Sequence, residues 1–140
     1  MTREEKKLIL KDLGGRLAFG VKCYIPEVDT TSILGAIQED GENTLYDFWE
    51  DSRKIQYMYQ LYTSEFKPCL FPLSSMTEEQ KNEFNSYVWF GGIQSNWESF
   101  DGVMLSEIKD LMDFFHKNHI DYRGLIEKGL AIDATNLNIY

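Results

Sequence analysis

Two histidines and an aspartate late in the chain are the residues best suited to bind a metal ion. His116 and His119 are three positions apart, which places both imidazoles near one face of a helix, and Asp121 follows closely. Imidazole nitrogens and carboxylate oxygens are common ligands of divalent metals. Histidines near the C-terminal end of a helix are also favoured by its dipole alone. We prefer this second interpretation, because the His-Glu-x-x-His pattern of zinc enzymes is absent, and we expect no cofactor.

Four other residues are candidates for contact with a partner: Trp97, Phe100, Tyr122 and Arg123. The guanidinium of Arg123 can bind a phosphate or carboxylate in bidentate fashion. The alternative, which we prefer, is that Asp121 caps a short helix while Arg123 forms an intramolecular ion pair. Aromatic side chains are enriched at binding surfaces but also build cores. Trp97 and Phe100 follow a polar, glycine-containing segment, so we expect them to be the most exposed aromatics.

The sequence contains no signature of a known catalytic site. The Gly-x-Ser-x-Gly elbow, the Gly-x-x-x-x-Gly-Lys-Ser/Thr phosphate loop and the Gly-x-Gly-x-x-Gly fingerprint are all missing. Cys23 and Cys69 fit neither a metal-binding pair nor a disulfide framework, so we expect reduced thiols packed as small hydrophobic groups. We therefore name no catalytic residue, and an enzyme is the less favoured interpretation.

The composition is that of a folded domain with an acidic surface. The 140 residues are 43% hydrophobic and 26% charged, which is sufficient for one core in a single domain over 1–140. The net charge of −9 is uneven, because residues 1–22 carry six basic and three acidic side chains and the remainder carries eight and twenty. This field repels phosphates, so we expect no direct nucleic-acid binding. No apolar run approaches about 20 residues and no secretory signal is present, so we expect a cytoplasmic protein without membrane contact.

The first half of the chain is patterned as a helix followed by short strands. Thr2 and Glu5 have capping-box spacing, which predicts a helix over 3–13 that ends at two glycines. Alternation of apolar residues predicts strands over 21–25, 31–38, 44–49 and 55–62. The segment 66–73 contains two prolines, which favours an edge strand or an extended crossover. These strands predict an antiparallel meander or an SH3-like barrel.

The second half is patterned as helices. Thr77 and Gln80 have capping-box spacing at the start of a helix. A helix over 105–118 is the best-defined element, since its expected inward face is formed by Ile108, Leu111, Met112 and Phe115. A short helix over 122–128 and an irregular or short-strand tail over 130–140 complete the chain.

The segment Asn-His-Ile-Asp-Tyr-Arg-Gly-Leu-Ile-Glu-Lys-Gly-Leu-Ala at 118–131 resembles the tails of short uncharacterised proteins from gut anaerobic bacteria and their phages or mobile elements. Similar blocks are Gly-Val-Lys at 20–22, Lys-Pro at 67–68 and Pro-Leu-Ser-Ser-Met-Thr at 72–77. The resemblance implies no activity. It does imply a β-rich N-terminal lobe joined to a helical C-terminal lobe, which agrees with the pattern. We therefore expect an α+β fold, with the β-rich lobe over 1–73 and the helical lobe over 74–140.

Three functions are open on the sequence alone. The preferred hypothesis is a small acidic interaction or accessory protein, bacterial or from a mobile element, that binds another macromolecule, most simply another protein with a basic surface. The second is a small enzyme or metal-binding protein that uses His116 and His119 with acidic side chains. The third is an acidic mimic of nucleic acid. The oligomeric state is not predicted.

Overall fold

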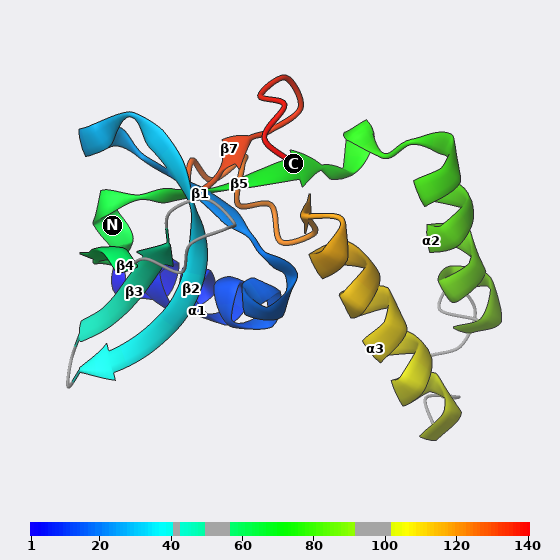
Figure 1. Ribbon diagram of the computed structural model, residues 1–140. Coiled ribbons are helices and arrows are strands. Elements are labelled where there is room, and N and C mark those ends of the chain that lie inside the picture. Colours follow the sequence, from blue (N-terminus) through cyan, green and yellow to red (C-terminus); the bar gives the residue numbers. More distant parts are fainter. Residues whose placement is uncertain (41–42, 50–56, 92–101) are drawn as a thin grey trace.

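The computed structural model describes residues 1–140 except 41–42, 50–56 and 92–101 (Figure 1). Its helices are α1 (Arg3–Arg16), α2 (Glu78–Gly91) and α3 (Gly102–Lys117). Its strands are β1 (Lys22–Ile25), β2 (Thr30–Asp40), β3 (Asn43–Trp49), β4 (Tyr57–Leu61), β5 (Lys67–Pro72), β6 (Ile120–Asp121) and β7 (Ile132–Asp133). Four short 3-10 helices are η1 (Leu17–Phe19), η2 (Pro26–Val28), η3 (Thr63–Glu65) and η4 (Leu73–Ser75). The fold is α+β, as predicted.

The strands form one mixed sheet in the order β4-β3-β2-β1-β5-β6, and β7 also pairs with β5. Strands β1 to β4 pair as an antiparallel meander, whereas β6 and β7 run parallel to β5. The sheet is open, so the SH3-like barrel alternative is wrong (Figure 1). The prediction that 66–73 is an edge strand or crossover is also wrong, because β5 has neighbours on both sides. Its prolines are tolerated there because Pro68 is the second residue and Pro72 the last, where few ladder hydrogen bonds are needed.

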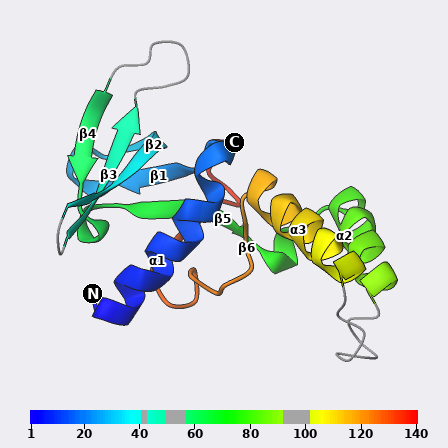
Figure 2. The ribbon, with the colours of Figure 1, turned by 90° about the horizontal axis from the view of Figure 1, so that it is seen from below.

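The described residues form two hydrophobic clusters. In the larger one, α1 packs on one face of the sheet, where Ile9 and Leu13 meet Leu34 and Phe48, all nearly inaccessible to solvent (Figure 2). The smaller cluster centres on Phe114 between α2 and α3, which lie side by side beyond β5. The tail after β6 returns to the larger cluster through buried residues such as Leu125, Leu130 and Ala131. None of the helices in the described residues is long and apolar enough to cross a bilayer.

One predicted helix boundary and one predicted helix are wrong. The first helix does not end at its two glycines but continues through Gly15 to Arg16. Packing favours glycine at position 15, since a Cβ there would lie 2.6 Å from Cε1 of His116 and would displace that ring. The residues 122–128 form turns rather than a helix. The backbone N–H groups of Leu125 and Ile126 donate to the Asp121 carboxylate, each at 2.9 Å, and so fold the chain back locally.

The contact between Gly35 and Trp49 gives a first testable prediction. Strand β2 has a bulge between Leu34 and Ala36, and the Trp49 indole of β3 covers Gly35 so closely that an added Cβ would lie 0.9 Å from Nε1. Gly35→Ala must therefore displace the ring, and we expect a loss of about 1 to 3 kcal/mol in the free energy of unfolding. Gly14→Ala on α1 is the control, because nothing lies within 4 Å of its added methyl group. Equal denaturant midpoints for the two variants would contradict this packing.

Candidate functional site

A groove of about 530 Å³ lies between α1 and the start of β3. One wall is the exposed side of α1, where Arg3, Lys6, Lys7 and Leu10 line the groove. Their spacing of three, four and seven residues places them on one helical face. The adjoining face of the helix carries Ile9 and Leu13 into the core, and Leu10 packs against that core, so the cations lie on the exposed flank of α1 beside its buried face.

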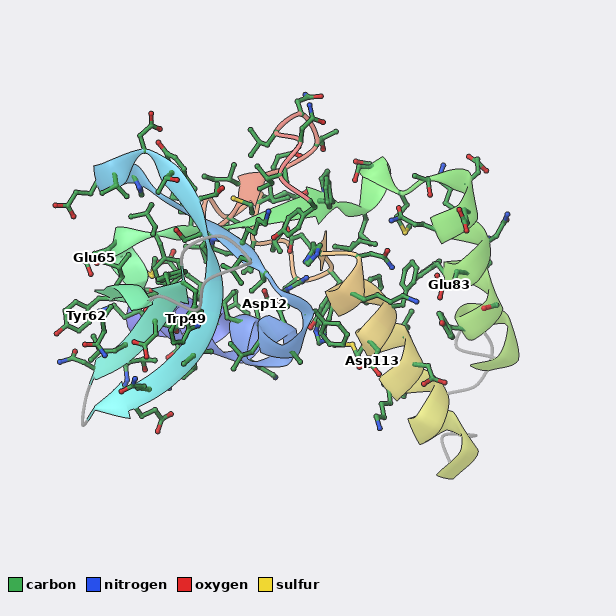
Figure 3. All side chains as sticks on the ribbon, viewed as in Figure 1. Asp12, Trp49, Tyr62, Glu65, Glu83 and Asp113 are labelled. Carbon is green, nitrogen blue, oxygen red and sulfur yellow. The ribbon has the colours of Figure 1, made fainter. Side chains whose placement is uncertain are left out.

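The other wall comes from two segments that are distant in the sequence from α1. Strand β3 contributes Asn43 and Thr44, and the segment before β5 contributes Tyr62, Thr63 and Ser64. These side chains are uncharged and carry hydroxyl or amide groups that can donate hydrogen bonds. Tyr62 is 48% exposed. Figure 3 shows Tyr62 and Glu65 on the side of the molecule that lies away from α2 and α3. The segment is held in place by Glu65, whose carboxylate accepts from the Tyr62 backbone N–H at 2.6 Å.

The described lining residues include three cations and no carboxylate, although the chain carries a net charge of −9. A carboxylate does adjoin the groove, because Glu4 pairs with Lys7 at 3.7 Å. The Lys7 and Glu4 side chains are 61% and 82% exposed, and such solvated pairs contribute little free energy. The groove cations therefore remain available to a ligand of opposite charge.

The amino-acid sequence alone singled out none of these lining residues. Its one relevant signal was the excess of basic side chains in residues 1–22. That excess could have pointed to α1, but periodicity alone does not show which strands flank a helix.

Three of the predicted residues, His116, Tyr122 and Arg123, lie in a buried polar cluster where α1, α3 and β6 meet. The His116 Nε2 atom and the Tyr122 hydroxyl are 2.9 Å apart and form a hydrogen bond. The guanidinium carbons of Arg16 and Arg123 lie 5.3 Å and 4.8 Å from the centre of the Tyr122 ring, within range of cation–π attraction. These side chains contact one another, and the Arg123 side chain is also 21% exposed to solvent.

The centre of this cluster is the ion pair of Asp12 and Arg16 on α1. Arg16 Nε donates to Asp12 Oδ2 at 2.7 Å, and both side chains are inaccessible to solvent. A second nitrogen of Arg16, Nη2, donates to the Ile120 carbonyl of β6 at 2.6 Å. Arg123 Nε lies 3.2 Å from Asp12 Oδ1, an ion pair without hydrogen-bond alignment. Arg123 thus takes the intramolecular role that the sequence favoured.

The proposed metal ligands are not brought together. Asp121 accepts backbone N–H bonds, His116 faces Tyr122, and the His119 ring stacks on Tyr140 with centroids 3.7 Å apart. Within the described residues, no group of three histidine, cysteine, aspartate or glutamate side chains could hold a metal ion. Trp97 and Phe100 lie outside the described residues.

The two thiols are also poorly placed for chemistry. Cys23 and Cys69 are buried in β1 and β5. Burial raises the pKa of Cys23 well above its usual value and the pKa of Cys69 to about 11. Both are therefore thiols rather than nucleophilic thiolates at neutral pH.

The environment of His119 predicts a pH dependence of stability. Burial, with smaller contributions from the charges of Arg16 and Lys22, lowers the pKa of His119 from 6.5 to about 4. Between these pH values the unfolded chain binds a proton at His119 that the folded chain does not, so acidification favours unfolding. We expect His119→Asn, which tolerates the local φ of 57°, to flatten the loss of stability from pH 6.5 to pH 4. Unchanged slopes in urea melts across this range would contradict the assignment.

Comparisons with protein families, with curated proteins and with solved structures found no match to this chain.

Proposed function

We propose that this chain is a small interaction protein that binds another macromolecule through the groove between α1 and the start of β3. The observation that carries the proposal is the composition of this groove, which Arg3, Lys6 and Lys7 line together with the exposed Tyr62. Arginine and tyrosine are enriched at protein interfaces, and cations along a concave wall attract a charged partner. The three cations contribute little to folding, since Arg3, Lys6 and Lys7 are exposed.

The other hypotheses have less support. Most polar groups of the buried cluster are paired with one another, although Arg16 Nη1 and Arg123 Nε have no hydrogen-bond partner among the described residues. The cluster therefore offers fewer free polar groups to a ligand than the groove does. A mimic of nucleic acid needs carboxylates in a row, whereas the exposed carboxylates are spread over the fold, for example at Glu4 on α1, Glu39 on β2, Glu79 on α2 and Asp110 on α3.

Affinity capture with matched variants tests the proposal. The wild-type protein, a Lys6→Glu/Lys7→Glu variant and a Lys11→Glu control are immobilised and exposed to lysate from the organism that encodes the chain. Lys11 is exposed on the same helix but is not among the described lining residues. We expect the control to retain the same proteins as the wild type, and the groove variant to retain about tenfold less, because two attractive charges become repulsive. Equal retention by the groove variant would overturn the proposal.

A further inference from the structure

From the charge and dimensions of the groove, and resting on its proposed binding role, we infer that its occupant is a short acidic segment of a partner protein, bound through aspartate or glutamate carboxylates. The described lining residues offer three cations and no carboxylate. Thr44, Ser64 and Asn43 on the other wall can donate hydrogen bonds to carboxylate oxygens. This combination of charges and donors complements an anion.

The reach of the cationic wall fits a short segment. Arg3 to Leu10 spans about 10 Å of helix, since each residue rises about 1.5 Å. An extended peptide advances about 3.3 Å per residue, so the wall covers about three or four residues. Side chains alternate between faces of an extended chain, so two carboxylates of such a segment face α1 at a time. The flanking Tyr62 ring then packs against the apolar part of the segment.

The charge outside the groove argues against a nucleic acid in the same place. Residues after position 22 carry eight basic and twenty acidic side chains. A nucleic acid is negatively charged along its whole length, so any part that extends beyond the groove is repelled by this surface. A short acidic segment of a protein places its charge only where the cations are.

Glu4 provides a test that depends on the groove rather than on folding. Its carboxylate pairs with Lys7 at 3.7 Å and so occupies one of the three cations. An acidic ligand must compete with this carboxylate. Glu4→Gln removes the competitor and is expected to tighten binding of an acidic probe by about two- to threefold, as expected for an exposed pair.

Fluorescence anisotropy with defined probes tests the inference. Fluorescein-labelled hexaglutamate, hexalysine and dodecathymidylate are titrated with the full-length protein at about 20 mM salt, where screening is weak. We expect hexaglutamate to bind, hexalysine not to bind at the groove, and the oligonucleotide to bind more weakly than hexaglutamate. The Lys6→Glu/Lys7→Glu variant should weaken hexaglutamate binding about tenfold, whereas Lys11→Glu should change it less than twofold. Circular dichroism verifies that each variant retains the fold.

The outcomes separate this inference from the proposed function. The inference is overturned if hexaglutamate does not bind, or if it binds the Lys6→Glu/Lys7→Glu variant as tightly as the wild type. Tighter binding of dodecathymidylate than of hexaglutamate also overturns it and assigns the groove to nucleic acid. If capture from lysate is still lost in the Lys6→Glu/Lys7→Glu variant, the interaction role stands with a partner of other chemistry. If capture is unchanged, the proposed function itself fails.

Discussion

Replacement of Asp12 by alanine is expected to lower the free energy of unfolding by about 3 to 5 kcal/mol. Asp12, labelled in Figure 3, is inaccessible to solvent and is the counter-ion of Arg16, whose side chain is equally buried. Arg123 approaches the same carboxylate. The variant therefore leaves a buried guanidinium without a counter-ion, and this desolvated charge accounts for most of the loss. Urea denaturation of the single variant measures the effect.

Two further variants show whether the charge is the cause. Asp12→Leu combined with Arg16→Met replaces the pair by apolar groups of similar volume, so we expect it to recover much of the stability lost in Asp12→Ala. Glu4→Ala removes an exposed partner of Lys7 and should change stability by about 0.5 kcal/mol or less. A double variant as unstable as Asp12→Ala, or an Asp12→Ala loss as small as that of Glu4→Ala, would contradict the account.

The second large effect is expected for Phe114→Ala, with a loss of about 3 to 5 kcal/mol from lost burial and a residual cavity. The Phe114 ring is inaccessible to solvent and packs against Phe84 and Tyr87 of α2, with centroid distances of 6.4 Å and 6.0 Å. Leu111→Ala should cost less, because Leu111 is only partly buried beside this cluster.

Asp113→Ala is the matched control for the phase of α3, since Asp113 is the exposed neighbour of Phe114 (Figure 3). We expect a change of about 0.5 kcal/mol or less, measured as a shift of the denaturant midpoint. If Phe114→Ala and Asp113→Ala gave similar midpoints, the packing of α3 against α2 would be wrong.

Local patterns in the sequence predicted most of the elements. The capping box of Thr2 and Glu5 is present, with both hydrogen bonds formed, and so is the pair of Thr77 and Gln80. The alternating runs predicted β1, β2 and β3 in their correct places. These features depend on hydrogen bonds and periodicities within a few residues, which a single sequence displays directly.

The inward face of α3 was only partly predicted. The stripe through Leu111 and Phe115 omitted Phe114, which is the most buried aromatic of that helix. A single stripe describes a helix with one packed face, whereas α3 contacts both α2 and α1. Its buried surface is therefore wider than the apolar stripe.

The candidate site depends on tertiary contacts that no local pattern contains. Asp12 and Arg16 have the spacing of an ordinary exposed helical pair, but both side chains are buried, and Arg16 also donates to the Ile120 carbonyl of β6. The groove likewise needs residues 43–44 and 62–64 to approach α1. Hydrophobic periodicity orients each element toward a core but does not name its neighbours.

Site-specific photocrosslinking in cells that express the protein tests the groove most directly as the contact surface. Photoreactive p-benzoylphenylalanine is incorporated at position 62 in the groove wall or at position 73 on η4, where the native Tyr62 and Leu73 are 48% and 45% exposed. We predict a discrete crosslinked species from position 62, its loss when Lys6→Glu and Lys7→Glu are added, and no such species from position 73. Equal crosslinking from both positions, or a position 62 crosslink that survives both charge reversals, would contradict the proposal that the groove binds the partner.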